Sequence, residues 1–64
     1  MATTPATISL NLAGEELAVL NGLLDTEQAR LLVEIRHTDH RSFREDLRRR
    51  LEIVERLIEQ CERG

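Results

Sequence analysis

Apolar residues recur every three or four positions along two long segments of the chain, a spacing that predicts two amphipathic α-helices. In residues 15–36 the apolar stripe consists of Leu17, Leu20, Leu24, Leu31 and Ile35. In residues 42–62 it consists of Phe43, Leu47, Leu51, Val54, Ile58 and Cys61. Because only residues 37–41 separate the helices, we expect an all-α fold in which they form an antiparallel two-helix hairpin.

The first helix contains one local conflict, at Gly22. A glycine in a helix interior costs about 1 kcal/mol relative to alanine, and Asp25 with Gln28 would serve as a capping pair for a new helix. We expect one continuous helix, bent near Gly22, with two short helices as the alternative. The glutamates at residues 15–16 complement the helix dipole in the first turn, and Asn11 is the nearest side chain suited to cap it.

Ser42 and Glu45 match a capping box, which predicts that the second helix begins at Ser42. Thr38 or Asp39 would cap it one turn earlier. The outer face of this helix carries opposite charges four residues apart, a spacing at which exposed pairs contribute about 0.2–0.5 kcal/mol each. The predicted pairs are Glu45–Arg49, Asp46–Arg50, Arg48–Glu52, Glu52–Arg56 and Glu59–Arg63.

Polar and apolar side chains alternate strictly over residues 7–12, which is the period of a half-buried strand. No second strand segment follows, so this stretch either pairs with the same stretch of a second chain or lies as an extended arm over residues 8–12. Residues 1–7 are mostly small and polar with one proline, and we expect them to be disordered.

Both helices carry more apolar residues than one hairpin can cover; the additional ones are Leu23, Leu32, Val33, Ile53 and Leu57. A domain near this size buries only about 60% of its unfolded surface, and the chain has one cysteine and no clear metal framework to compensate. We therefore expect a homodimer in which two hairpins form an antiparallel four-helix bundle. The alternatives are another helical protein as the partner, a monomer, and a larger ring or tetramer. The expected packing residues are Leu17, Leu20, Leu24, Leu31, Ile35, Phe43, Leu47, Leu51, Val54 and Ile58.

Composition reduces the number of possible classes of function. The chain has 64 residues, one third of them charged, and a formal net charge of −3, which predicts a single domain and disfavours nucleic-acid binding. It has no glycine-rich phosphate loop, no Cys-x-x-Cys and no nucleophile motif, so we expect no enzyme activity, no cofactor and no small-molecule substrate. Without an apolar run of about 20 residues or a second cysteine, we expect no membrane span and a cytoplasmic protein.

The run from Glu34 to Leu47 (EIRHTDHRSFREDL) resembles a segment shared by short, mostly uncharacterised bacterial helical-hairpin proteins. Their pattern also includes an opening like residues 8–12 (ISLNL) and a Glu-Glu-Leu helix start like residues 15–17, so the resemblance covers about residues 8–60. Such proteins often have Thr or Ser followed by Pro where this chain has Ala13-Gly14, so its first helix start is atypical. The resemblance implies a helical hairpin and no established activity.

The turn holds one compact group of metal-type ligands, His37, Asp39 and His40. The His-x-x-His spacing puts two imidazoles on one side of a helical turn, but a zinc site needs three or four protein ligands. We therefore predict that no metal binds there, that Asp39 caps the second helix and that His37 stabilises the end of the first. A metal-binding hairpin is an alternative.

The same turn offers an ion pair that would fix the two helices to each other. Glu34 or Asp39 paired with Arg44 would act as this latch of the hairpin.

A strand followed by two helices is also the order of elements in ribbon–helix–helix DNA-binding proteins, in which the strand pairs across a dimer and reads the major groove. Thr7, Ser9 and Asn11 would then be the side chains available to bases. The arm has no Arg or Lys and the chain is acidic. We therefore expect a small non-enzymatic oligomerisation or protein-interaction module and keep the DNA-binding regulator as the alternative.

Overall fold

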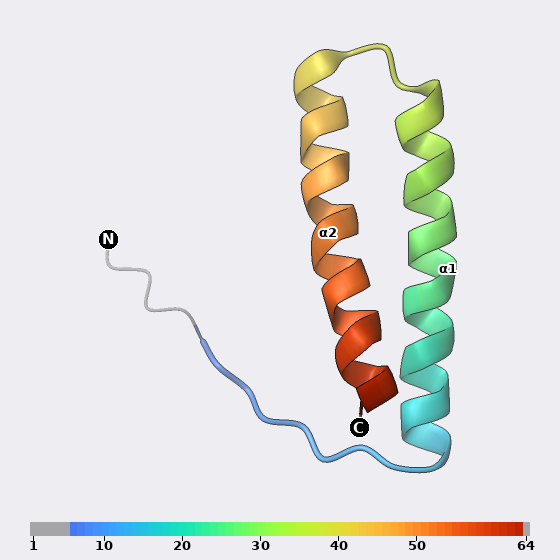
Figure 1. Ribbon diagram of the computed structural model, residues 1–64, viewed down its shortest axis with the longest axis vertical. Coiled ribbons are helices and arrows are strands. Elements are labelled where there is room, and N and C mark those ends of the chain that lie inside the picture. The colour runs from blue at the N-terminus through green and yellow to red at the C-terminus, as the bar shows by residue number, and fades with distance from the viewer. Residues whose placement is uncertain (1–5, 64) are drawn as a thin grey trace.

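The computed structural model describes residues 6–63, and two long α-helices make up most of them. α1 spans Glu15–His37 and α2 spans Arg41–Arg63, each with 23 residues. The helices lie side by side and run antiparallel, joined by the short loop of residues 38–40 (Figure 1). The predicted two-helix hairpin is confirmed, and each predicted helix end lies within one residue of the observed one.

Residues 6–13 form neither helix nor strand. They approach the start of α1 as an extended segment that passes the C-terminal end of α2 (Figure 1). Of the two predictions for residues 8–12, the extended arm is therefore the one found in the single chain. The disorder predicted for residues 1–7 concerns mostly residues that lie outside the described part of the chain.

A narrow apolar seam between the helices holds the hairpin together. Its four buried side chains are Leu24 and Leu31 of α1 and Leu47 and Val54 of α2. In each helix the two buried residues are seven positions apart, which is two helical turns and keeps them on one stripe. Five partly buried residues pack around them: Leu20, Ile35, Leu51, Ile58 and Cys61.

The predicted stripe fails at its first position in α2, Phe43. Phe43 is 53% exposed, although Leu47, one turn further along the same stripe, is buried. Phe43 lies in the first turn of α2, beside the loop, where α1 ends at His37 and offers few further side chains to cover an aromatic ring. At the other end of the hairpin, Leu17 in the first turn of α1 is half-buried.

α1 begins without a capping side chain. Gly14 at the N-cap position has a φ of 61°, in the left-handed region that glycine adopts without strain. Its carbonyl accepts the Ala18 N–H at 3.1 Å. The predicted cap by Asn11 is wrong, because no side chain caps the helix and Asn11 lies three residues before the cap position. Beyond this start α1 is continuous through Gly22, as predicted.

Side chains close the loop by binding backbone carbonyls. Thr38 Oγ1 donates to the Glu34 carbonyl at 2.6 Å. Arg44 donates to the Thr38 carbonyl through Nε at 3.2 Å and Nη2 at 2.6 Å. The predicted latch between Arg44 and the carboxylate of Glu34 or Asp39 is therefore wrong, because Arg44 instead satisfies a carbonyl just beyond the C-terminal end of α1.

α2 begins at Arg41, one residue before the predicted capping box. Ser42 already lies inside the first turn, with Oγ 3.3 Å from Nδ1 of His40, and the His40 carbonyl accepts the Arg44 N–H at 2.9 Å. The predicted box of Ser42 and Glu45 is therefore not formed, because a residue inside the helix is past the cap position. Asp39, the other predicted cap, makes no side-chain hydrogen bond within residues 6–63.

Leu31→Ala should lower the free energy of unfolding by about 2–5 kcal/mol, because it removes a fully buried side chain and leaves a cavity in the seam. Val33→Ala, on the exposed side of the same helix, should change it by no more than about 0.5 kcal/mol. Chemical denaturation followed by far-ultraviolet circular dichroism, at equal protein concentrations, measures both. Equal losses from the two substitutions would contradict the seam as described.

Candidate association face

The two helices leave a shallow groove between them on one side of the hairpin. It has a volume of about 410 Å³, and residues of both helices line it, including Glu27 of α1 and Arg50, Ile53 and Leu57 of α2. On α1, residues spaced three or four positions from Glu27 lie on the same side of the helix. We call this surface the groove face, and its residues are Leu20, Leu23, Glu27, Arg30, Glu34, Asp46, Arg49, Arg50, Ile53 and Leu57.

Towards the open end of the hairpin, the groove face is apolar. Leu23 is 64% exposed, Ile53 48% and Leu57 42%, although all three are large aliphatic side chains. Single exposed leucines are common on protein surfaces, but several on one face form a patch of the kind found at interaction sites. This half of the groove face is therefore the part of the hairpin best suited to pack against another helix.

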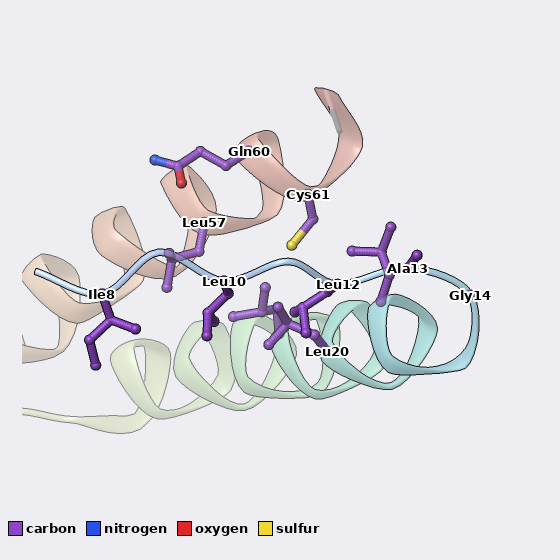
Figure 2. Close-up of a pocket in the computed structure, with 11 residues that line it drawn as sticks. Ile8, Leu10, Leu12, Ala13, Gly14, Leu20, Leu57, Gln60 and Cys61 are labelled. Carbon is purple, nitrogen blue, oxygen red and sulfur yellow. The ribbon is translucent and has the colours of Figure 1, made fainter.

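The apolar half continues into a larger groove of about 670 Å³ beside the N-terminal arm (Figure 2). Its lining includes Ile8 and Leu10 of the arm, Leu20 of α1 and Leu57 of α2. Ile8 and Leu10 stay largely exposed in this position. The arm therefore borders the groove without filling it.

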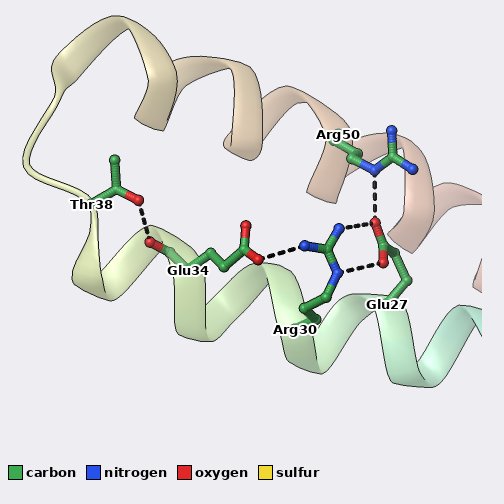
Figure 3. A network of polar contacts seen from close by, with 5 residues as sticks. All are labelled: Glu27, Arg30, Glu34, Thr38 and Arg50. Carbon is green, nitrogen blue, oxygen red and sulfur yellow. Dashed lines mark hydrogen bonds and ion pairs between the residues drawn. The ribbon is translucent and has the colours of Figure 1, made fainter.

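Towards the loop, the groove face is charged, and Glu27 is at the centre of its contacts (Figure 3). The Glu27 carboxylate accepts hydrogen bonds from Arg30 Nε at 2.9 Å and Arg30 Nη2 at 2.7 Å, and from Arg50 Nε at 2.7 Å. Arg30 Nη1 also binds Glu34 at 2.5 Å. The contact between Glu27 and Arg50 joins the two helices by an ion pair.

These contacts shift the pKa values of Glu27 and Arg30. Hydrogen bonds from Arg30 and then from Arg50 lower the pKa of the Glu27 carboxyl from 4.5 to about 2. The bonds to Glu27 and Glu34 in turn raise the pKa of Arg30 above its ordinary value. The network therefore stays charged and paired near neutral pH. Because Arg30 and Arg50 remain about half exposed or more, solvent screens much of the attraction.

The ion pairs predicted along α2 are wrong: within residues 6–63, none of the five forms a salt bridge. Exposed pairs gain little from closing in water, and Arg50 binds Glu27 of the other helix instead of Asp46. The sequence spacing contained the signal for Glu27–Arg30 and Arg30–Glu34, which are three and four residues apart. The contact to Arg50 depends on how the helices are aligned, which spacing within one helix does not show.

On the opposite side of the hairpin, a second polar contact joins the helices. Gln28 Nε2 donates to Glu55 Oε2 at 3.3 Å. Gln28 is the polar residue that interrupts the apolar stripe of α1. It directly follows Glu27 in the chain, so the two side chains point to different sides of the helix. The seam is thus bordered by a polar contact between α1 and α2 on each side.

The structure does not bring the predicted metal ligands together. His37 is the last residue of α1, Asp39 lies in the loop, and His40 precedes α2; all three are exposed. In the described part of the chain, no group of three His, Cys, Asp or Glu side chains is placed to share a metal ion. The nearest partner of the His40 ring is the Ser42 hydroxyl.

Comparison with known proteins found no family model, no curated protein and no solved structure that matches the chain. The resemblance to short bacterial hairpin proteins stays a prediction. Within residues 6–63, neither helix is long and apolar enough to cross a membrane.

We expect the free energy of unfolding to decrease as the pH falls from about 4.5 towards 2, in part through Glu27. The pKa of Glu27 is about 2 in the fold and 4.5 ordinarily. Its ion pairs therefore stabilise the fold above pH 4.5, and this contribution is lost as Glu27 becomes protonated. Urea denaturation at several pH values measures the effect.

Glu27→Gln should make this acid dependence shallower. Glu59→Gln is the matched control, because Glu59 is exposed on α2 and forms no salt bridge within residues 6–63. It should leave the acid dependence unchanged. Identical pH profiles for the native chain and Glu27→Gln would show that the Glu27 ion pairs add nothing to stability.

Proposed function

We propose that this chain is a small non-enzymatic oligomerisation module that forms a homodimer, in which the groove faces of two hairpins pack together as an antiparallel four-helix bundle. The observation that carries the proposal is the exposure of Leu23, Ile53 and Leu57 on one face of the hairpin. Within residues 6–63 the seam buries only four hydrophobic side chains. A second hairpin on the groove face would give each helix a second apolar neighbour.

The polar half of the groove face suits binding better than catalysis. Glu27, Arg30, Glu34 and Arg50 are bound to one another. A general base works best with a pKa near the working pH, whereas the pKa of Glu27 is about 2. Charges that are already paired also lose less than isolated charges when a partner covers them. These properties support a role in association.

Two further parts of the proposal concern location and nucleic acid. The single cysteine suits a reducing compartment, and we place the module in the cytoplasm.

A ribbon–helix–helix regulator would need the arms of two chains to pair as strands. Because residues 6–13 form no strand in the single chain and carry no Arg or Lys, no observation favours that alternative.

The combined substitution Leu23→Glu and Leu57→Glu should raise the dimer dissociation constant by at least about 100-fold. Each change occurs twice in a symmetric dimer, and burying a polar group without a partner costs about 1–3 kcal/mol. Sedimentation velocity over a range of protein concentrations measures the constant, and circular dichroism verifies that the variant remains helical.

Leu32→Glu with Val33→Glu is the matched control. It adds the same charge to exposed aliphatic positions that lie on α1 away from the groove face, so it should leave the dissociation constant unchanged. A native chain that sediments as a folded monomer at micromolar concentration would refute the dimer. Equal weakening by both double substitutions would show that a different surface is used.

A further inference from the structure

The groove face is divided along its length into two chemically different halves. Leu23, Ile53 and Leu57 make the half towards the open end apolar. Towards the loop, the ion pairs of Glu27 with Arg30 and Arg50 make the other half charged. The direction in which a second copy lies on this face therefore determines which groups meet.

We propose that the two copies point the same way, with both loops at one end of the bundle and a two-fold axis parallel to the helices. This inference rests on the proposed homodimer. In this arrangement the apolar half of each copy meets the apolar half of the other, and the charged halves also meet. Turning one copy end over end would place Leu23 and its neighbours against the ion pairs of Glu27, which would remove charged groups from water without new partners.

The charges of the two helices support the same arrangement. When both copies point the same way, α1 of each lies against α2 of the other, whereas the end-over-end arrangement places each helix against its own copy. α1 has five acidic residues and two arginines, and α2 has six acidic residues and seven arginines. An acidic helix therefore meets a slightly basic one only when the copies point the same way.

The charged half of the groove face shows the same difference in net charge between α1 and α2. α1 contributes two carboxylates and one arginine to its charged half, and α2 contributes one carboxylate and two arginines. These residues are Glu27, Arg30 and Glu34 on α1 and Asp46, Arg49 and Arg50 on α2. Opposite net charges face each other across the proposed dimer, which favours this register over others.

The available area also favours complete overlap of the two faces. A helix of 23 residues is about 35 Å long and about 10 Å wide, so two helices side by side present a face of roughly 700 Å². A stable interface buries about 800 Å² on each partner. An end-over-end dimer that paired only the apolar halves would cover about half of the face, too little for a stable complex.

A distance between spin labels tests the direction of the two copies. Arg41→Cys in a Cys61→Ala background places one nitroxide label per chain at the loop end of α2, at an exposed position outside the groove face. If the copies point the same way, pulsed electron paramagnetic resonance should give an interlabel distance of roughly 25 Å, set by the width of the bundle. The end-over-end arrangement adds about 33 Å along the helix axis and gives roughly 40 Å.

The same labelled chain with Leu23→Glu and Leu57→Glu is the control and should show no interlabel distance. A distance near 40 Å in the labelled chain, lost in this control, would overturn the proposed direction and leave the groove-face dimer intact. No defined distance in the labelled chain, together with sedimentation as a monomer, would overturn both. A distance near 25 Å that persists in the control would place the contact on another surface and overturn the proposal.

Discussion

Everything else in this molecule depends on one packing constraint: two helices share a single seam. Leu24 and Leu31 meet Leu47 and Val54 there, and no third element covers the other sides of the helices within residues 6–63. A helix in a bundle normally buries a wider apolar stripe than this, against two neighbours. The same packing that forms the hairpin therefore leaves aliphatic side chains in water, and the groove face is the surface where they gather.

Polar contacts then select one alignment of the helices. An aliphatic seam with a seven-residue spacing would allow one helix to shift along the other by whole turns with modest loss of packing. Such a shift would break Glu27–Arg50 on one side and Gln28–Glu55 on the other. It would also pull Arg44 from the Thr38 carbonyl. Each bond contributes little by itself in water, but together they favour a single register. That register sets Glu27 against Arg50 near the middle of the two helices.

The sequence predicted the parts of this structure that depend on periodicity. Stripes with steps of three and four residues gave both helices and most of the seam, because burial against one neighbour requires that spacing. The helix starts were predicted less well. Local capping rules favoured Asn11 and Ser42, whereas Gly14 precedes α1 and α2 begins one residue before Ser42. Capping rules also did not include the contact of Arg44 with the Thr38 carbonyl, which closes the loop before α2.

The candidate site was only partly predictable for a related reason. The excess of apolar residues was visible in the sequence, but not that Leu23, Ile53 and Leu57 would share a face while Leu32 and Val33 would not. That depends on the rotation of each helix about its axis, which the seam fixes. Glu27 had no distinguishing signal beyond its spacing to Arg30, because its contact with Arg50 joins residues 23 positions apart.

The three-residue loop has a consequence for the order in which the hairpin forms. Closing so short a loop costs little chain entropy, and local contacts of this kind favour fast folding. We expect the helices to associate first near Thr38 and Arg44 and then pair progressively towards the open end. The open end also lacks a capping side chain at Gly14, so it closes last and opens first. The apolar half of the groove face belongs to that late-forming end, so its surface is complete only in the fully formed hairpin.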